Sequence, residues 1–247
     1  MWDLDSADAF VVFDRQDSGC LSFGIERDGR RWFVKRATDA AAAVSLTRAS
    51  GLHAAVRHRA IVRPVHIRDG MDGITLVYPW QAGQVLNAAT SAGSDRSGLL
   101  RFQSLPPESV FQAIDELLDA HLAIAAAGYV AVDLYDGCFL HDFSADRMHL
   151  IDLDEYRPGP FVLDSERLPG SLRYLAPEQQ KRGSLVDERT TVFALGRTLH
   201  ELLDSPNGWR GSGSRRAVVE RATAADPERR HQTVAALVRG WQTSGGE

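Results

Sequence analysis

The sequence predicts an α+β fold in which a small five-stranded antiparallel sheet with one main helix precedes a larger, mostly helical part. Short strand-like runs separated by turn-forming residues dominate the first 80 positions. From Val110 onward, apolar residues recur mainly at helical spacing. Strands grouped before helices are typical of α+β proteins.

Five strands are expected in the first part. Three of them cover residues 9–14, 20–26 and 31–35, and the turn-forming residues in RQDSG and RDGR separate them. Two more are expected over residues 61–67 and 73–79, around the turn-rich sequence RDGMDG. Together these runs predict the five-stranded sheet.

One main helix is expected among these strands, over residues 40–56, because alanine and leucine there favour helix formation. Thr38 or Asp39 can cap its N-terminus. Residues 88–98 are rich in Ser, Gly and Ala, and they separate the strands from the helical remainder.

The boundary between the two parts is expected near Trp80, with residues 1–80 in the smaller part and residues 81–247 in the larger one. A long helix over residues 110–127 should end at Gly128, because glycine is favoured just after a helix C-terminus. Two short strand-like runs, CFLHDF and MHLIDL, come next. Helices should then resume near three positions: Asp187, Arg215 and His231.

Size and composition fit one folded enzyme domain, with 247 residues of which 44% are apolar. A formal net charge of -5 gives no overall positive field, so nucleic acid is not expected as a partner. Cys20 and Cys138 form neither a metal quartet nor a disulfide framework, which indicates a reducing cytoplasm. The N-terminus lacks the features of a signal peptide, and no stretch reaches the roughly 18 apolar residues that a membrane span requires.

Arginine supplies nearly all of the positive charge. Of 28 Lys and Arg residues only Lys35 and Lys181 are lysines, so the sequence uses arginine almost wherever a cation is needed. A lysine that is retained is therefore informative.

Six fragments occur in order along the chain: WFVKRA, ITLVYPWQAGQVL, GYVAVDLYDGCFL, HLIDLDEY, GSLRYLAPE, and TVFALGRTLHELL with DPERR. In this order and spacing they resemble the eukaryotic-type Ser/Thr protein kinase family, in its bacterial form, over residues 10–241. GSLRYLAPE followed by VFALG is the most specific part, because phosphotransferases that act on antibiotics or sugars generally lack it. The resemblance implies a bilobal kinase-like fold with ATP bound between the lobes.

The resemblance implies three catalytic residues. Lys35 would bind the α- and β-phosphates of ATP, because its compact ammonium suits phosphate oxygens. Asp133 would act as the catalytic base, and Asp152 would hold Mg²⁺ or Mn²⁺. Taken alone, these residues have plainer interpretations: a solvated lysine at a strand edge, a cap or turn aspartate, and an acidic turn.

The resemblance also implies a nucleotide site and a substrate segment. Gly19 would be the last glycine of the loop that covers the phosphates. Tyr78 and Trp80 would lie in the hinge, where backbone groups bind adenine, although VYPW is equally compatible with a buried edge strand and a turn. Leu140 is assigned to the same nucleotide site. Ser171 would lie close to the protein substrate.

An ion pair and a substituted helix residue would affect the structural support of the expected site. Arg230 is expected to form a buried ion pair with Glu178, with a structural role. Thr191 replaces the aspartate of the central helix of the large lobe, which predicts a looser backbone around Asp133.

The helix and loop residues that assist catalysis in the family are partly replaced. No glutamate occurs between Glu26 and Glu108, so the helix after Lys35 cannot supply the usual partner of that lysine. Asp39 is better suited to cap the helix than to substitute for it. Val132 stands where many kinases carry the arginine that receives a phosphorylated segment.

Two further replacements concern the transferring phosphate and the metal. Tyr135 occupies a lysine position, and Cys138 occupies the position of a metal-binding asparagine. A neutral thiol is a poor ligand for a hard, oxygen-seeking ion. Asp136 or Asp154 is therefore the candidate for a second oxygen ligand.

The function expected from this resemblance is an ATP-dependent transfer of the γ-phosphoryl group to a hydroxyl of a protein substrate. A pseudokinase that binds nucleotide or acts as a scaffold is the alternative, because several catalytic residues are replaced. A small-molecule phosphotransferase is the third possibility, and the GSLRYLAPE segment argues against it.

Overall fold

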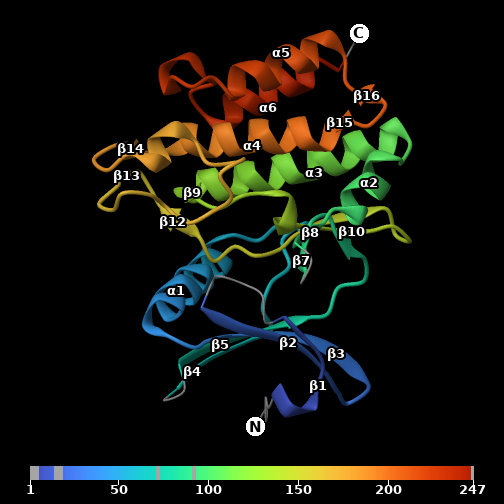
Figure 1. Cartoon of the computed structure of the whole chain (residues 1–247), viewed down its shortest axis with the longest axis vertical. Coiled ribbons are helices and arrows are strands. Elements are labelled where there is room, and N and C mark those ends of the chain that lie inside the picture. The colour runs from blue at the N-terminus through green and yellow to red at the C-terminus, as the bar shows by residue number, and fades with distance from the viewer. Residues whose placement is uncertain (1–5, 14–18, 71–72, 91–92, 246–247) are drawn as a thin grey trace.

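The computed structural model describes residues 6–13, 19–70, 73–90 and 93–245. Within these residues the protein is a mixed α+β structure with a five-stranded antiparallel sheet and six α-helices, which confirms the α+β class and the five-stranded sheet. Figure 1 shows the sheet and α1 at one end of the longest axis and helices α3 to α6 at the other. No helix in this part of the chain is both long and apolar enough to cross a bilayer.

The five-stranded sheet has the strand order β1-β2-β3-β5-β4, with every neighbouring pair antiparallel. Asp28 and Gly29 both have positive φ, 53° and 67°, and form the tight turn between the second and third strands. The strands are β1 (Ala9–Phe13), β2 (Cys20–Arg27), β3 (Arg30–Ala37), β4 (His66–Gly70) and β5 (Gly73–Pro79).

The strand expected over residues 61–67 is wrong over residues 61–65, because β4 begins only at His66. Ile61 instead forms a parallel bridge to Leu150. The Leu150 N–H donates to the Ala60 carbonyl at 2.7 Å, and the Val62 N–H donates to the Leu150 carbonyl at 3.2 Å. The chain after α1 is thereby attached to the larger part of the molecule.

The main helix of the sheet end is α1 (Ala40–Ala55), within one residue of its expected range. Asp39 is its N-cap and accepts a hydrogen bond from the Ala42 N–H at 2.8 Å, as its position in the sequence predicts. The buried Leu46 packs with Ile74 and Leu76 of β5, which fixes the helix against the sheet.

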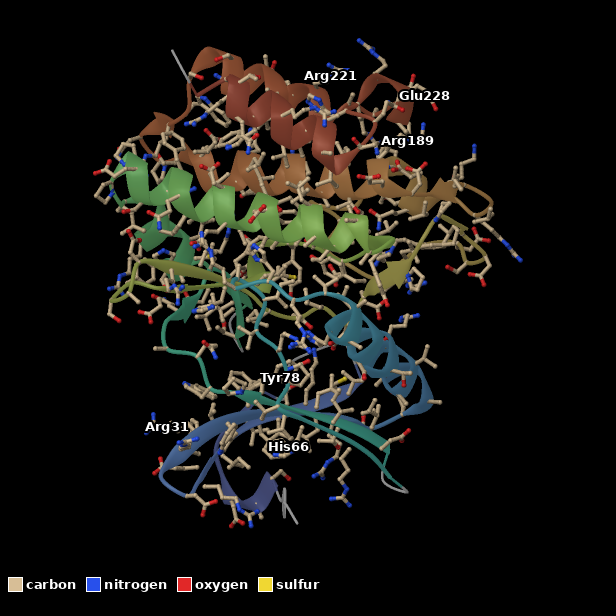
Figure 2. The ribbon with its side chains drawn as sticks, turned by 180° about the vertical axis from the view of Figure 1, so that it is seen from behind. Arg31, His66, Tyr78, Arg189, Arg221 and Glu228 are labelled. Carbon is tan, nitrogen blue, oxygen red and sulfur yellow. The ribbon has the colours of Figure 1, made fainter. Side chains whose placement is uncertain are left out.

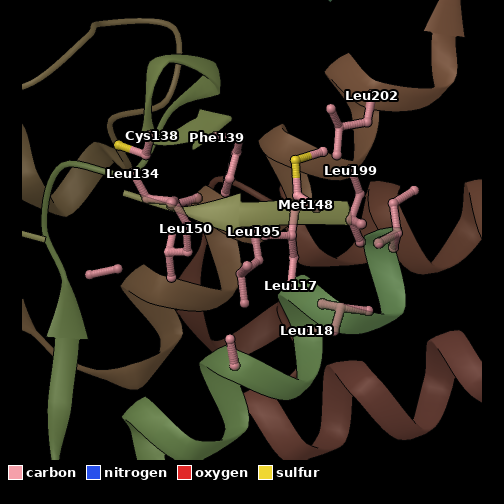
Figure 3. Packing of buried hydrophobic residues seen from close by; sticks show 14 of the residues in the cluster. Leu117, Leu118, Leu134, Cys138, Phe139, Met148, Leu150, Leu195, Leu199 and Leu202 are labelled. Carbon is pink, nitrogen blue, oxygen red and sulfur yellow. The ribbon is translucent and has the colours of Figure 1, made fainter. Parts of the chain in front are cut away.

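The larger part is built around one apolar cluster to which all of its long helices contribute. Figure 3 shows Leu117 and Leu118 of α3 packed with Leu195 and Leu199 of α4 and with Met148. The helices are α2 (Ser97–Gln103), α3 (Pro107–Ala126), α4 (Glu188–Leu203), α5 (Gly213–Ala222) and α6 (Val234–Thr243).

Residues 88–98, expected only to separate the strands from the helical part, contain secondary structure of their own. They contain β7 (Ala88–Thr90), β8 (Gly93–Asp95) and the start of α2. Gly98 lies so close to the Val85 carbonyl that a Cβ atom there would clash with it. This glycine therefore reflects close packing of α2, which composition alone does not reveal.

Short strands carry the segments that form the site. Asp133 follows β9, and Asp152 follows β11. Each of these strands is held by an antiparallel partner, β12 and β10 respectively. The short strands are β6 (Gln84–Val85), β9 (Tyr129–Ala131), β10 (Phe139–Asp142), β11 (Arg147–Leu150), β12 (Tyr156–Pro158), β13 (Phe161–Val162), β14 (Leu185–Val186), β15 (Asp204–Ser205) and β16 (Gly208–Trp209).

The expected ion pair between Arg230 and Glu178 is confirmed. Arg230 Nη1 and Nη2 donate to the two carboxylate oxygens of Glu178 at 2.7 and 2.9 Å. The Thr190 hydroxyl adds a third hydrogen bond to Glu178 at 2.8 Å. The Arg230 side chain is wholly buried, so this bidentate pair fixes the segment around Glu178 to the end of the helical part.

Candidate functional site

Lys35 lies at the centre of a cluster of carboxylates. Its side chain extends from β3, is buried, and donates from Nζ to Asp152 Oδ1 at 2.6 Å. Asp154 Oδ2 forms a second ion pair with the same ammonium. Burial alone would lower the pKa of Lys35, but Asp152 and Asp154 outweigh it and raise the pKa well above its ordinary value. Lys35 is therefore a permanent cation, and its partners are two aspartates in place of a helix glutamate.

The loop after β11 presents these two aspartates in an unusual backbone conformation. Asp152 has φ +60°, a left-handed conformation that aspartate tolerates better than most residues. Its side chain is 34% exposed, whereas that of Asp154 is buried. Leu153 between them is anchored in the main apolar cluster. Backbone strain of this kind concentrates at functional sites.

Asp133 lies against the segment that contains Ser171. The backbone N–H of Ser171 lies near the Asp133 carboxylate and opposes part of the rise in its pKa. Gly170 has φ +128°, and a Cβ atom there would come within 2.9 Å of Asp133 Oδ1. Burial, followed by the charges of Asp152 and Glu155, raises the pKa of Asp133 to about 7. A carboxylate with such a pKa can exchange protons near neutral pH, as a general base does.

We expect this raised pKa to appear as an acid limb in any phosphate transfer. The rate should rise with pH around a midpoint near 7, because Asp133 must be ionised to accept a proton. Between roughly pH 4, the unfolded pKa, and about 7 the folded protein binds more protons than the unfolded chain, so stability falls as pH rises.

The melting temperatures of the wild type and of Asp133→Asn, measured at pH 5 and at pH 8, test whether the charge of Asp133 lowers stability as pH rises. The variant should be stabilised relative to the wild type more at pH 8 than at pH 5. Asp164→Asn, on an exposed aspartate, is the control. An equal difference in melting temperature between variant and wild type at both pH values would contradict the raised pKa of Asp133.

The two candidates for a second oxygen ligand are in different places. Asp136 is buried, and its carboxylate oxygens accept from Asn87 Nδ2 at 2.9 Å and Arg96 Nε at 3.2 Å. Both oxygens are thus used to fix the loop. Asp154, by contrast, lies beside Asp152 at the Lys35 ammonium. Of the two, Asp154 is positioned to act with Asp152.

Cys138 is part of the core. Its thiol is fully buried in the main apolar cluster (Figure 3) and lies 3.6 Å from the Asp133 carbonyl oxygen, to which it donates. Burial raises the pKa of this thiol well above its ordinary value, so it stays protonated. Tyr135 packs over Gly137 and beside the ring of Tyr174. Cys138 therefore supplies no oxygen ligand, and Tyr135 supplies no cation.

Cys138→Asn is therefore expected to destabilise the protein without raising its turnover. The asparagine carbonyl would be buried without a donor, which costs about 1–3 kcal/mol. Denaturant midpoints measure the loss of stability and transfer rates measure turnover, with Cys138→Ser as the smaller matched change. By contrast, Asp154→Asn should lower turnover strongly, because Asp154 is the candidate for the second oxygen ligand. A higher turnover in Cys138→Asn would show that an oxygen ligand is missing at this position.

Tyr78 lies near Lys35. Its hydroxyl is 3.3 Å from His53 Nε2 of α1, and burial followed by the charge of Asp154 raises the pKa of Tyr78 well above its ordinary value. Figure 2 labels Tyr78 at the sheet end of the molecule, far from Arg189. The Tyr78 side chain thus turns toward α1 and the carboxylate cluster.

The other predicted nucleotide residues contact separate parts of the chain. The Gly19 carbonyl accepts from the Thr38 N–H at 3.0 Å, and the preceding residues of the expected phosphate loop, 14–18, lie outside the described residues. Trp80 packs edge-on against Phe10, with ring centroids 5.0 Å apart. Leu140 lies in β10, where it pairs with β6.

Thr191 binds the backbone before Asp133. Its hydroxyl accepts from the buried Ala131 N–H at 2.9 Å. A looser backbone than an aspartate would give at this position stays a prediction. Val132 packs in an apolar cluster with Leu163 and Leu168, and it offers no cation to a phosphate.

Glu155 is a residue of the site to which the resemblance assigned no role, although it lies within HLIDLDEY. Its carboxylate accepts from Ser45 and Arg48 of α1, and its carbonyl accepts from the Val132 N–H at 3.2 Å. The only signal in the sequence is a further acidic residue after Asp154 in HLIDLDEY.

The site as a whole combines one buried ammonium with an excess of carboxylates. In the described residues no group of three or more His, Cys, Asp or Glu side chains is arranged to hold a metal on its own. Asp152 and Asp154 provide two oxygen donors, which suits a hard cation that also takes ligands from phosphates. Neither a protein-family model nor a curated protein sequence matches this chain.

Proposed function

We propose that the chain is an ATP-dependent phosphotransferase of the Ser/Thr protein kinase type, which transfers the γ-phosphoryl group to a protein hydroxyl. Residues 1–80 and 81–247 would be the two lobes of one kinase-like fold. The observation that carries the proposal is the ion pair between Lys35 of β3 and Asp152, 117 positions later, with Asp133 close enough to interact electrostatically with both.

The roles follow from the charges. Lys35 would bind phosphate oxygens, because a compact ammonium with three donors suits them. Asp152 and Asp154 would hold Mg²⁺ or Mn²⁺, which neutralises charge on the phosphates when bound. Cys138, a buried thiol, does not fit the same ion.

Asp133 would act on the substrate. Its carboxylate would accept the proton of the attacking hydroxyl as the bond from that oxygen to phosphorus forms and the γ-phosphoryl group leaves ADP. Ser171 lies beside Asp133, and the next residue, Leu172, is 63% exposed.

A nucleotide-binding pseudokinase is the second candidate, and the catalytic loop favours it. Tyr135 packs on Gly137 where the family supplies a lysine, and Cys138 is a protonated thiol where it supplies a metal ligand. Stabilisation of the transferring phosphoryl group would then depend on Lys35 and the metal alone. Such a protein would bind ATP and signal through its conformation.

A combined binding and transfer assay separates these candidates. ATP with Mg²⁺ or Mn²⁺ should raise the melting temperature, because a ligand at 100 times its Kd stabilises by about 2.7 kcal/mol. Radiolabelled γ-phosphate should also appear on a generic protein substrate, and Asp152→Ala should remove this transfer. A melting shift without transfer would support the pseudokinase. Transfer by Asp152→Ala at the wild-type rate, or no response to nucleotide, would refute the kinase proposal.

A further inference from the structure

Glu155 joins α1 to the loop that carries Asp152 and Asp154. The Ser45 hydroxyl donates to Glu155 Oε1 at 2.5 Å. Arg48 Nη2 lies 3.1 and 3.3 Å from the two carboxylate oxygens and also donates to the Ser45 hydroxyl at 2.8 Å. The side chains of Arg48 and Glu155 are only 24% and 19% exposed, so solvent screens this pair less than a surface ion pair.

The backbone of the same residue joins the loop to the strand that leads to Asp133. The Glu155 carbonyl accepts from the Val132 N–H, one residue before the candidate base. Directly after it, Tyr156 pairs with Ala131 between β12 and β9. Glu155 also follows Asp154 without an intervening residue. One residue therefore contacts the helix with its side chain and the base-bearing strand with its main chain.

In the family the resemblance points to, this helix supplies a glutamate. Here the helix supplies the cation and the loop supplies the carboxylate. α1 carries no glutamate, and Lys35 takes its partners from the loop. The helix contributes an arginine and a serine, and the loop contributes the carboxylate. Arg157 Nη2 donates to Glu155 Oε2 at 2.9 Å, which fixes the carboxylate from its other side.

We propose that Glu155 is a positioning residue, which holds the metal-binding loop and the strand before Asp133 in place through its contacts with α1. When Ser45 and Arg48 hold Glu155, the metal-binding loop and the strand before Asp133 are fixed together. Without these contacts, the loop and the strand lose their common attachment. This inference rests on the proposed function for its effect on transfer, but the attachment itself can be tested without any activity.

A double-mutant cycle on Arg48→Met and Glu155→Gln tests the coupling. Each single variant should lower kcat for phosphate transfer about tenfold, equivalent to about 1.4 kcal/mol, with little change in KM for ATP. The double variant should be no worse than either single one, because all three lose the same bond. Arg48→Lys should recover part of the rate. Arg57→Met, on an exposed arginine just beyond α1, is the matched control.

Hydrogen exchange provides the readout that does not depend on catalysis. In Arg48→Met and Glu155→Gln the amides of Val132 and Tyr156 should exchange faster than in Arg57→Met, although neither amide is in α1. If the wild type transfers no phosphate but exchange changes in this way, the kinase proposal fails and the attachment stands. Unchanged exchange at both amides, or additive effects on kcat in the cycle, would overturn the positioning role.

Discussion

Replacement of Lys35 by methionine is expected to remove the rise in melting temperature caused by ATP and to abolish phosphate transfer. The lost ammonium is the buried cation at the carboxylate cluster, and a charge-assisted hydrogen bond to phosphate contributes about 1.5–3 kcal/mol. Without it, Asp152 and Asp154 would also repel the phosphates. The measurement is the melting temperature with and without ATP and Mg²⁺, together with a transfer assay.

The same variant should melt at a lower temperature even without nucleotide. Asp154 would remain buried without its cation, which disfavours its ionised form. Circular dichroism should still report a folded protein. Lys181→Met, which changes the only other lysine of the chain and lies at an exposed position, is the control and should behave as the wild type. An unchanged ATP response in Lys35→Met would exclude Lys35 from a nucleotide site.

Replacement of Arg230 by methionine is expected to destabilise the protein by about 3–5 kcal/mol, the usual cost of removing one partner of a buried ion pair. Glu178 would keep the Thr190 hydroxyl but lose both guanidinium hydrogen bonds. The free energy of unfolding in urea measures the loss. Arg229→Met, on the exposed neighbouring arginine, should change it little.

A second variant tests how much of this destabilisation comes from leaving the Glu178 carboxylate buried without a partner. Combining Arg230→Met with Glu178→Leu removes the stranded carboxylate, so this double variant should be more stable than Arg230→Met. If Arg230→Met costs less than 1 kcal/mol, about the worth of a surface pair, the bidentate pair does not hold the two segments together.

Local patterns predicted the elements whose causes are local. The strands β2, β3 and β5 follow from apolar runs between turn-forming residues, and the Asp28–Gly29 turn sets their hairpin. The capping of α1 by Asp39 follows from one side chain and its neighbours in sequence. These features need no information about the rest of the chain.

The elements that were missed depend on contacts between distant segments. Ile61 leaves the expected strand because it pairs with Leu150, and Gly98 is glycine because α2 packs on the Val85 carbonyl. Neither contact leaves a period or a motif in the sequence. A composition rich in small residues can mean a linker or close packing, and only the three-dimensional arrangement distinguishes them.

For the site, the order of motifs pointed to Lys35, Asp133 and Asp152, and the structure brings these three residues together. It did not indicate which aspartate accompanies Asp152 or what replaces the missing helix glutamate. Both answers lie in the ion pairs of Lys35 with Asp152 and Asp154, which join residues more than 100 positions apart. A sequence without its fold does not specify such pairs.

The parallel bridge between Ile61 and Leu150 constrains how the sheet end can rotate relative to the helical end. Residues 60–62 are hydrogen-bonded to Leu150, so the sheet is linked to this fixed point through α1 on one side and through residues 63–65 on the other. The C-terminal end of α1 leads through residues 56–59 to residues 60–62, which are hydrogen-bonded to Leu150. Because Leu46 of α1 also packs on β5, the helix joins the sheet to this attachment point.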